Sequence, residues 1–138
     1  MPYATVVKKS LFDAAHKNPG FGEGHKCART HGHTFQYEVG VRAKINPETG
    51  LSIDFGAIKK AMKEAVDDVL DHRHLNEEIP YFKAVHPSAE NIAIFIFLAV
   101  DQHLMDYYDD YLEKGVQVQY VKLDETPTSS VIIRKEDL

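Results

Sequence analysis

The sequence predicts an α+β fold in which a four-stranded antiparallel sheet carries two helices on one face. The first observation is that alternating or β-branched segments lie towards both ends of the chain, at residues 3–16, 34–46, 116–123 and 130–134. The second is that the apolar residues between these segments recur at helical spacing. The predicted order is therefore β-β-α-α-β-β, with a hairpin at each end and the helices in the middle.

Strict alternation makes the second strand the clearest element of the chain. Every second residue from Phe35 to Ile45 is apolar, and the residues between them are polar or glycine. This pattern is typical of a strand with one dry and one wet face. The first strand, residues 3–16, places Phe12, Ala14 and His16 on one face, and a loop rich in glycine follows it.

Each of the two expected helices has a residue suited to cap its start. Asp54 can cap the first, residues 55–70, whose apolar residues follow at steps of three and four. Ser88 can cap the second, which extends to about residue 108 and is apolar nearly all round in its first half. Residues 71–87 between the helices contain two prolines and are expected to form a loop.

Composition limits the class of protein. The chain has 138 residues, of which 43% are hydrophobic and 27% charged, so we expect one soluble domain spanning residues 1–138. A net charge of −5 argues against a nucleic-acid partner. The longest apolar run, residues 92–100, is too short to cross a membrane. The single cysteine and the absence of a signal-peptide pattern favour a cytoplasmic location.

Three histidines are predicted to meet where the first two strands pair. His31 and His33 are two residues apart, so their side chains share one face of a strand. An antiparallel hairpin brings His16, at the end of the first strand, to this pair. Three histidines with a vacant fourth position are typical of catalytic zinc. The alternative is that they are ordinary surface or hydrogen-bonded histidines, because short motifs often occur by chance.

Cys27, the only cysteine, has three interpretations. Its neighbours Lys26 and Arg29 are cationic and favour the thiolate, which is the chemically active form. Alternatively, Cys27 is a fourth metal ligand that closes a structural site with the three histidines. The third alternative is an inert buried cysteine.

Two further sets of polar residues are candidates. Asp71 beside His72 can fix the imidazole tautomer for proton transfer, although a polar helix end explains the pair equally well. Glu125 falls in an expected turn, residues 124–128, and by itself is a turn carboxylate. The remaining histidines show no pattern and are expected to be surface residues: His25, His74, His86 and His103.

Several short motifs, taken together and in order, resemble the 6-pyruvoyl-tetrahydropterin synthase superfamily over nearly the whole chain. They are Phe12-Asp13-Ala14-Ala15-His16, Cys27-x-x-x-His31-Gly32-His33, Asp54-Phe55, Leu70-Asp71-His72, Leu75-Asn76, Pro87-Ser88-Ala89-Glu90-Asn91 and Glu125-Thr126. The short spacing from Cys27 to His31, after Glu23-Gly24-His25-Lys26, resembles the bacterial 6-carboxytetrahydropterin synthases of queuosine biosynthesis. The animal-type pyruvoyl enzymes have a longer insertion there.

The resemblance implies a tunnelling fold, in which the sheets of a homo-oligomer join into trimeric barrels that stack as a hexamer. It implies a zinc-dependent carbon–carbon lyase that converts 7,8-dihydroneopterin triphosphate to 6-carboxy-5,6,7,8-tetrahydropterin, acetaldehyde and triphosphate. The implied roles are zinc ligand for His16, His31 and His33, base for Cys27, proton relay for Asp71 and His72, and pterin binding for Glu125. Two alternatives remain: pyruvoyl synthase activity, which eliminates triphosphate and keeps the side-chain carbons, and a zinc-binding oligomer without catalysis.

Overall fold

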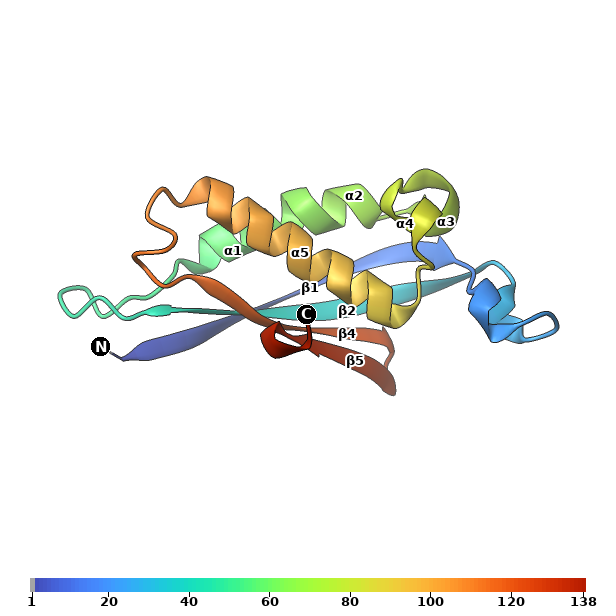
Figure 1. Ribbon diagram of the computed structural model, residues 1–138, viewed down its shortest axis with the longest axis horizontal. Coiled ribbons are helices and arrows are strands. Elements are labelled where there is room, and N and C mark those ends of the chain that lie inside the picture. Colours follow the sequence, from blue (N-terminus) through green and yellow to red (C-terminus); the bar gives the residue numbers. More distant parts are fainter. Residues whose placement is uncertain (1) are drawn as a thin grey trace.

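A mixed sheet forms one layer of the protein and helices form the other (Figure 1). The computed structural model describes residues 2–138. Its strands are β1 (Tyr3–His16), β2 (His31–Lys44), β3 (Arg73–His74), β4 (Gln117–Thr126) and β5 (Ser129–Arg134). They lie side by side in the order β3-β1-β2-β4-β5, and the long strands β1, β2, β4 and β5 pair antiparallel. The predicted α+β fold is confirmed.

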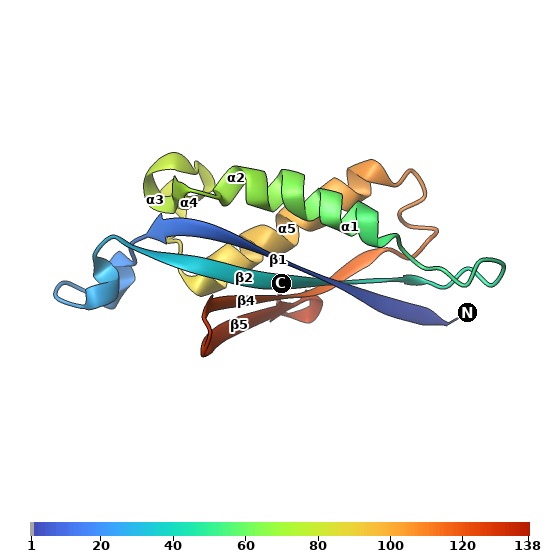
Figure 2. The ribbon, with the colours of Figure 1, turned by 180° about the vertical axis from the view of Figure 1, so that it is seen from behind.

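The helices lie on one face of this sheet, as the opposite view also shows (Figure 2). They are α1 (Phe55–Met62), α2 (Asp68–Leu70), α3 (Leu75–Glu78), α4 (Tyr81–Ala84) and α5 (Ala89–Tyr107). A π-helical turn, η3 (Lys63–Asp67), joins α1 to α2, so the first helix extends to Leu70 as predicted. None of the helices within residues 2–138 is long and apolar enough to cross a membrane.

Both predicted helix caps are present. The Asp54 carboxylate accepts a hydrogen bond from the Gly56 amide at 2.7 Å, and the Ser88 hydroxyl accepts one from the Asn91 amide at 3.1 Å. Each bond satisfies an amide that has no partner within its own helix. The Ser88 cap also fixes where α5 begins, directly after Pro87, whose carbonyl contacts the candidate site described below.

The prediction of four strands was wrong by one, because β3 adds a short fifth strand. Arg73 and His74 pair in parallel with Ala14 and Ala15 of β1. Two residues are too few for side-chain alternation to be recognised, and this pairing uses only backbone groups. The expected loop, residues 71–87, also contains the single-turn helices α3 and α4, which Leu75 and Phe82 anchor in the core.

The segment around β3 is fastened to β1 by side chains as well. The Asn76 amide oxygen accepts a hydrogen bond from the Lys17 N–H at 2.9 Å, and its Nδ2 donates to the Lys17 carbonyl at 3.0 Å. This pair of hydrogen bonds resembles one step of a β-ladder, because a side-chain amide offers the same donor and acceptor as a backbone amide. The end of β1 is therefore held on both edges, by β2 and by the segment that follows α2.

The core lies between the sheet and the helices. Alternate residues of β2 are buried, as predicted, and so is a row of large side chains on α5: Ile92, Ile96, Val100 and Leu104. A half-buried polar group, Asp67, borders this core at the π-turn. Asp67 accepts hydrogen bonds from Ser10 at 2.6 Å and Tyr37 at 2.8 Å, and burial raises the pKa of its carboxyl. These bonds tie the helical layer to β1 and β2 just before Asp71.

Candidate functional site

The β1–β2 hairpin brings three histidines together at one end of the sheet. His16 lies directly opposite His31 in the register, and His33 lies opposite Ala14, one diagonal step away. The ring centroids are 4.6 Å apart for His16 and His31, 4.8 Å for His31 and His33, and 5.4 Å for His16 and His33. One donor nitrogen from each ring lies within 4.8 Å of the other two. The three imidazoles can therefore converge on one ion.

Backbone carbonyls set the tautomer of two of these rings. His16 Nδ1 lies 2.7 Å from the Pro87 carbonyl, and His31 Nδ1 lies 2.7 Å from the Arg29 carbonyl. A carbonyl oxygen only accepts, so Nδ1 carries the proton in both rings and Nε2 keeps its lone pair. The Nε2 atoms of all three rings are shielded from solvent and have no hydrogen-bond partner among residues 2–138. A buried acceptor without a partner is costly, and a metal ion would satisfy all three.

Burial favours the neutral form of two of the three rings. It lowers the pKa of His16, which is fully buried, and it also lowers the pKa of His33. The neighbouring Glu125 carboxylate opposes both shifts. Neutral imidazole is the form that binds metals, so these two rings need to release little proton to bind an ion. Among residues 2–138, the group of converging donors contains these three imidazoles and no fourth side chain, a set that could hold zinc with one position open.

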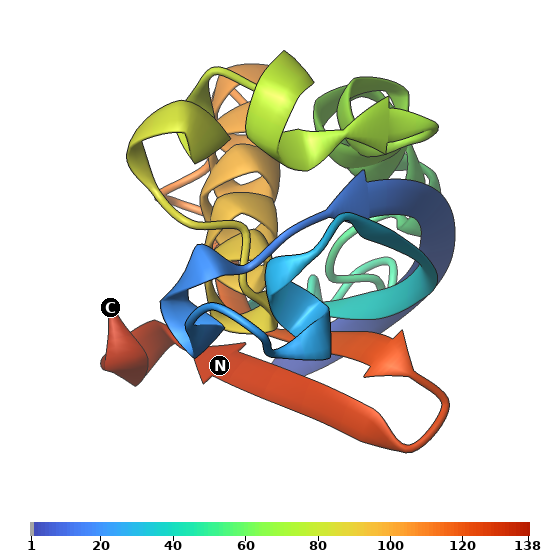
Figure 3. The same ribbon diagram turned by 90° about the vertical axis from the view of Figure 1, so that its right-hand side faces the viewer.

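Cys27 lies outside this donor group. It is half-buried in a short 3-10 turn, η2 (Lys26–Ala28), in the loop that connects β1 to β2. Figure 3 looks at the end of the molecule where this loop projects. The group of donors within 4.8 Å of one another contains the three histidines and not the Cys27 sulfur. The geometry thus favours an open site over one closed by the cysteine.

Glu125 lies in β4 and not in the turn where the sequence placed it. The register between β4 and β5 shifts between Asp124 and Thr126, which leaves Glu125 as the extra residue of a β-bulge. A bulge redirects a side chain, and here the carboxylate oxygens lie 3.8 Å from His33 Nε2 and 3.9 Å from His16 Nε2. These distances are too long for hydrogen bonds. A groove of about 350 Å³ runs between His33, Thr34, Glu125 and Thr126.

Asp71 and His72 form a second polar cluster on the other edge of β1. Asp71 Oδ2 lies 2.9 Å from His72 Nδ1, and Asp71 Oδ1 accepts the Asp13 amide at 2.9 Å. The His72 amide donates to the Asp13 carbonyl at 2.6 Å. The backbone of His72 is left-handed, with φ 59°, and within residues 2–138 no other residue except glycine has a positive φ. A left-handed residue is common just after a helix end, so this conformation fits the end of α2 as well as a functional role.

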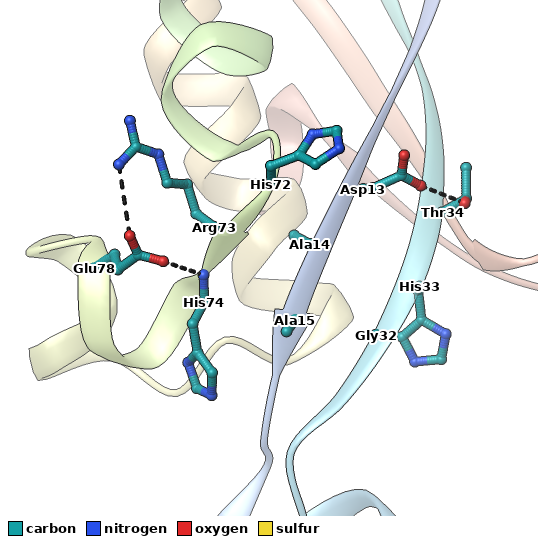
Figure 4. A pocket seen from close by; sticks show the side chains of 10 residues that line it. All are labelled: Asp13, Ala14, Ala15, Gly32, His33, Thr34, His72, Arg73, His74 and Glu78. Atoms are coloured by element: carbon teal, nitrogen blue, oxygen red, sulfur yellow. Dashed lines mark hydrogen bonds and ion pairs between the residues drawn. The ribbon is translucent and has the colours of Figure 1, made fainter.

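This pair does not join the histidine triad of its own chain. The two clusters of candidate donors, one with Asp13, Asp71 and His72 and the other with the three histidines, share no residue. Figure 4 shows the cavity of about 610 Å³ beside the pair, with the Thr34 hydroxyl donating to Asp13 and Glu78 bonded to Arg73 and to the His74 amide. The side chain of His72 is 78% exposed, so it is accessible from outside the chain.

Asp71→Asn is expected to lower the pKa of His72. The hydrogen bond and the charge of Asp71 favour the imidazolium and raise the pKa of His72. The amide keeps the shape but loses the charge, so the proton should leave His72 at lower pH. Titration of the His72 ring signals by NMR measures this shift. Glu64→Gln is the control, because it removes the carboxylate that lies 2.8 Å from His103 instead. An unchanged pKa of His72 in Asp71→Asn would contradict the pairing.

His25 has a structural role that the sequence pattern did not reveal. It is exposed, as predicted, and in addition its Nδ1 accepts a hydrogen bond from the Cys27 amide at 3.0 Å and so caps η2. The signal that would have found it is spacing, because a capping side chain accepts from the amide two residues later. Histidine is not among the usual capping residues, which is why the pattern passes unnoticed.

These observations define a two-layer α+β protein with a candidate metal site, and comparison with known proteins specifies its family. Residues 5–136 match the family described as 6-pyruvoyl tetrahydropterin synthase. The human 6-pyruvoyl tetrahydrobiopterin synthase is 34% identical over 106 residues, which cover 77% of this chain and 67% of that protein. An Archaeoglobus fulgidus protein, provisionally named 6-carboxy-5,6,7,8-tetrahydropterin synthase, is 34% identical over 124 residues and 90% of each chain.

A solved structure agrees with these sequence matches. The Caenorhabditis elegans 6-pyruvoyl tetrahydropterin synthase superposes with a TM-score of 0.81 at 25% identity, over 97% of this chain and 96% of that one. The chain belongs to the 6-pyruvoyl tetrahydropterin synthase family. The resemblance noted in the sequence and the predicted tunnelling fold of the single chain are confirmed.

Proposed function

We propose that this chain is a zinc-dependent 6-carboxytetrahydropterin synthase. It converts 7,8-dihydroneopterin triphosphate to 6-carboxy-5,6,7,8-tetrahydropterin, acetaldehyde and triphosphate, in queuosine biosynthesis in the cytoplasm. The observation that carries the proposal is the convergence of three buried, unpartnered Nε2 atoms, with the only cysteine nearby in sequence but outside the donor group. The short spacing from Cys27 to His31 and the Archaeoglobus relative support the carboxy reaction over the pyruvoyl reaction.

His16, His31 and His33 would hold the zinc ion. When bound, zinc supplies Lewis acidity that makes the side-chain hydroxyls of the substrate more acidic. The carbonyls of Pro87 and Arg29 hold two of the rings in the correct tautomer and orientation. Outer contacts of this kind change metal affinity by about 10- to 100-fold in metal sites generally. The third ring, His33, is 20% exposed and borders the groove next to Glu125, so the substrate would approach from that side.

Cys27 would act as the base that moves protons on the substrate side chain. A thiolate is the reactive form of a cysteine side chain. A base contributes only if it lies within hydrogen-bond reach of the proton that it removes. The loop from β1 to β2 starts beside His16 and ends beside His31, so it keeps Cys27 at the metal end of the sheet.

Asp71 and His72 would relay the proton, and a neighbouring subunit would supply them. Within one chain their donor atoms form a cluster separate from the histidine triad, while His72 remains accessible. The outer edge of β5 and most of the outer edge of β1 lack a strand partner in the described chain. Such edges invite pairing with another copy, so we propose a homo-oligomer, a trimer or a hexamer built from two trimers. Each chain, residues 1–138, would contribute one domain.

Glu125 would bind the pterin ring by accepting hydrogen bonds from its ring nitrogens. Glu125→Gln is expected to raise KM for the pterin substrate by about 10- to 100-fold, because a hydrogen bond to a charged group contributes about 1.5–3 kcal/mol. Zinc content should stay the same. Steady-state kinetics together with metal analysis checks this result. Glu136→Gln is the matched control, since Glu136 is an exposed carboxylate of the C-terminal 3-10 turn, residues 135–137, and does not line the groove. A loss of zinc in Glu125→Gln would make Glu125 a metal ligand instead.

Product identification tests the proposed reaction. The purified, zinc-loaded protein is incubated with 7,8-dihydroneopterin triphosphate, and the pterin and aldehyde products are identified by mass spectrometry. We expect 6-carboxytetrahydropterin and one acetaldehyde per turnover. A 6-pyruvoyl product without acetaldehyde would assign the chain to the pyruvoyl reaction. No turnover of either kind would leave a zinc-binding oligomer.

A further inference from the structure

The loop between β1 and β2 holds the backbone of Cys27 at both of its polar groups. The Cys27 carbonyl accepts a hydrogen bond from the Asn18 amide at 2.8 Å, and the Cys27 amide donates to His25 Nδ1 at 3.0 Å. Asn18 is 6% exposed, which makes it a firm point of attachment near the end of β1. The loop has no β-ladder of its own, so these two bonds hold the Cys27 backbone together with the turn bonds that the residues on either side of it make.

The hydrogen bond from the Cys27 amide defines the tautomer of the His25 ring. Because Nδ1 accepts from the Cys27 amide, the neutral ring of His25 carries its proton on Nε2. His16 and His31 have the opposite arrangement, with Nδ1 donating to a carbonyl. His25 is therefore oriented towards the cysteine backbone and not prepared as a metal ligand. It caps η2 in the way that an Asn or Asp side chain caps a helix, by accepting from the second amide of the turn.

An aromatic contact keeps this ring in place. Phe21 stacks on His25 with the ring centroids 4.5 Å apart and an interplanar angle of 15°. Phe21 is 56% exposed, so the stack on His25 lies at the surface of the loop. Phe21 lies in the preceding turn, η1 (Pro19–Phe21), so the stack also joins the two turns of the loop. Such contacts contribute about 0.5–1.5 kcal/mol in proteins.

We propose that His25 is a positioning residue for Cys27, which it holds in place through the cysteine amide. This inference rests on the proposed function, because it assumes that the Cys27 thiolate is the base. Phe21 supports the His25 ring, and Asn18 holds the other side of the cysteine. Displacement of a reacting group by about 1 Å can cost about 100-fold in rate, so fixing the backbone of Cys27 matters for turnover.

Two substitutions separate the hydrogen bond from the stack. His25→Phe keeps an aromatic ring against Phe21 but removes the acceptor. His25→Asn removes the ring but keeps a side-chain oxygen that can accept from the amide two residues later. His103→Asn is the matched control, a histidine replaced in the same way on α5, away from the loop. For each zinc-loaded protein, kcat, KM, zinc content and hydrogen exchange of the Cys27 amide are measured.

We expect His25→Phe to lower kcat by about 10- to 100-fold, with KM and zinc content unchanged and faster exchange at the Cys27 amide. His25→Asn should restore most of kcat and the protection of the amide, and His103→Asn should resemble the wild type. Unchanged kcat in His25→Phe, an equal loss in His25→Asn, or a loss of zinc in His25→Phe would overturn the inference.

The outcome for the wild type distinguishes this inference from the proposed function. If the wild type forms the pyruvoyl product, the proposed reaction fails, but the same comparison of kcat still decides the role of His25, because triphosphate release provides the rate. If the wild type turns over no pterin at all, both are wrong. If the wild type behaves as proposed and His25→Phe is fully active, only the role of His25 is wrong.

Discussion

His33→Ala is expected to abolish stable zinc binding and, with it, activity. Removing one of three nitrogen donors leaves two, which are too few for a tight site, and the effect should exceed the roughly 10- to 100-fold loss seen when only an outer contact is removed. His33 is more suitable for replacement than His16, because the His33 side chain is 20% exposed while His16 is fully buried. Replacing His16 would also open a cavity in the core and confuse the result.

Zinc per chain after dialysis, and the affinity from competition with a chelator, measure this loss. His103→Ala is a close control, since its side chain is 23% exposed and lies beside a carboxylate, much as His33 does. The control should keep its full zinc content. Full zinc content in His33→Ala would mean that the ion, if present, is held elsewhere, and the proposed site would have to be abandoned.

Cys27→Ala should have the opposite signature, with zinc retained and turnover lost. A general base contributes about 10²- to 10⁴-fold to a rate, and alanine cannot accept a proton. The sulfur lies outside the group of converging donors, so its removal should not weaken the metal site. Both backbone hydrogen bonds of Cys27 use main-chain atoms and persist in the variant. Product formation and zinc content in the same sample give the answer.

Cys27→Ser is the companion variant, because it keeps the size of the side chain but is a far weaker acid. It should be nearly as inactive as Cys27→Ala if a thiolate is required. The competing interpretation, a closed site with the cysteine as fourth ligand, predicts that Cys27→Ala loses zinc. Loss of zinc together with activity would therefore decide for a structural site and against the lyase.

The sequence predicts those parts of the fold that depend on periodic burial. The alternation from Phe35 to Ile45 identifies β2 and its buried face, because one face of a strand must be apolar to cover a core. The same parity brings His31 and His33 to one face, and antiparallel pairing of the two strands allows His16 to meet them. The exact register, with His16 opposite His31, comes from the structure.

Features that depend on backbone pairing or on a partner strand could not be predicted in this way. β3 is two residues long and leaves no pattern in its side chains. The bulge that turns Glu125 towards the histidines arises from the shift in register against β5, which no property of residues 124–128 encodes locally. The His25 cap lies in a loop rich in glycine, where neither helical nor strand periodicity applies.

The two hydrogen bonds between Asn76 and Lys17 limit the changes in length that this chain can tolerate. Asp71 is attached to Asp13 at one end of the segment and Asn76 to Lys17 at the other, with β3 paired in between. An insertion or deletion of even one residue within 71–76 would break the hydrogen bond at Asp13 or the pair at Lys17. It would therefore displace either His72 or the end of β1 that carries His16. The turn at residues 46–51 is different, because its hydrogen bonds join residues of the turn to one another, so a change in its length would not move His72 or His16.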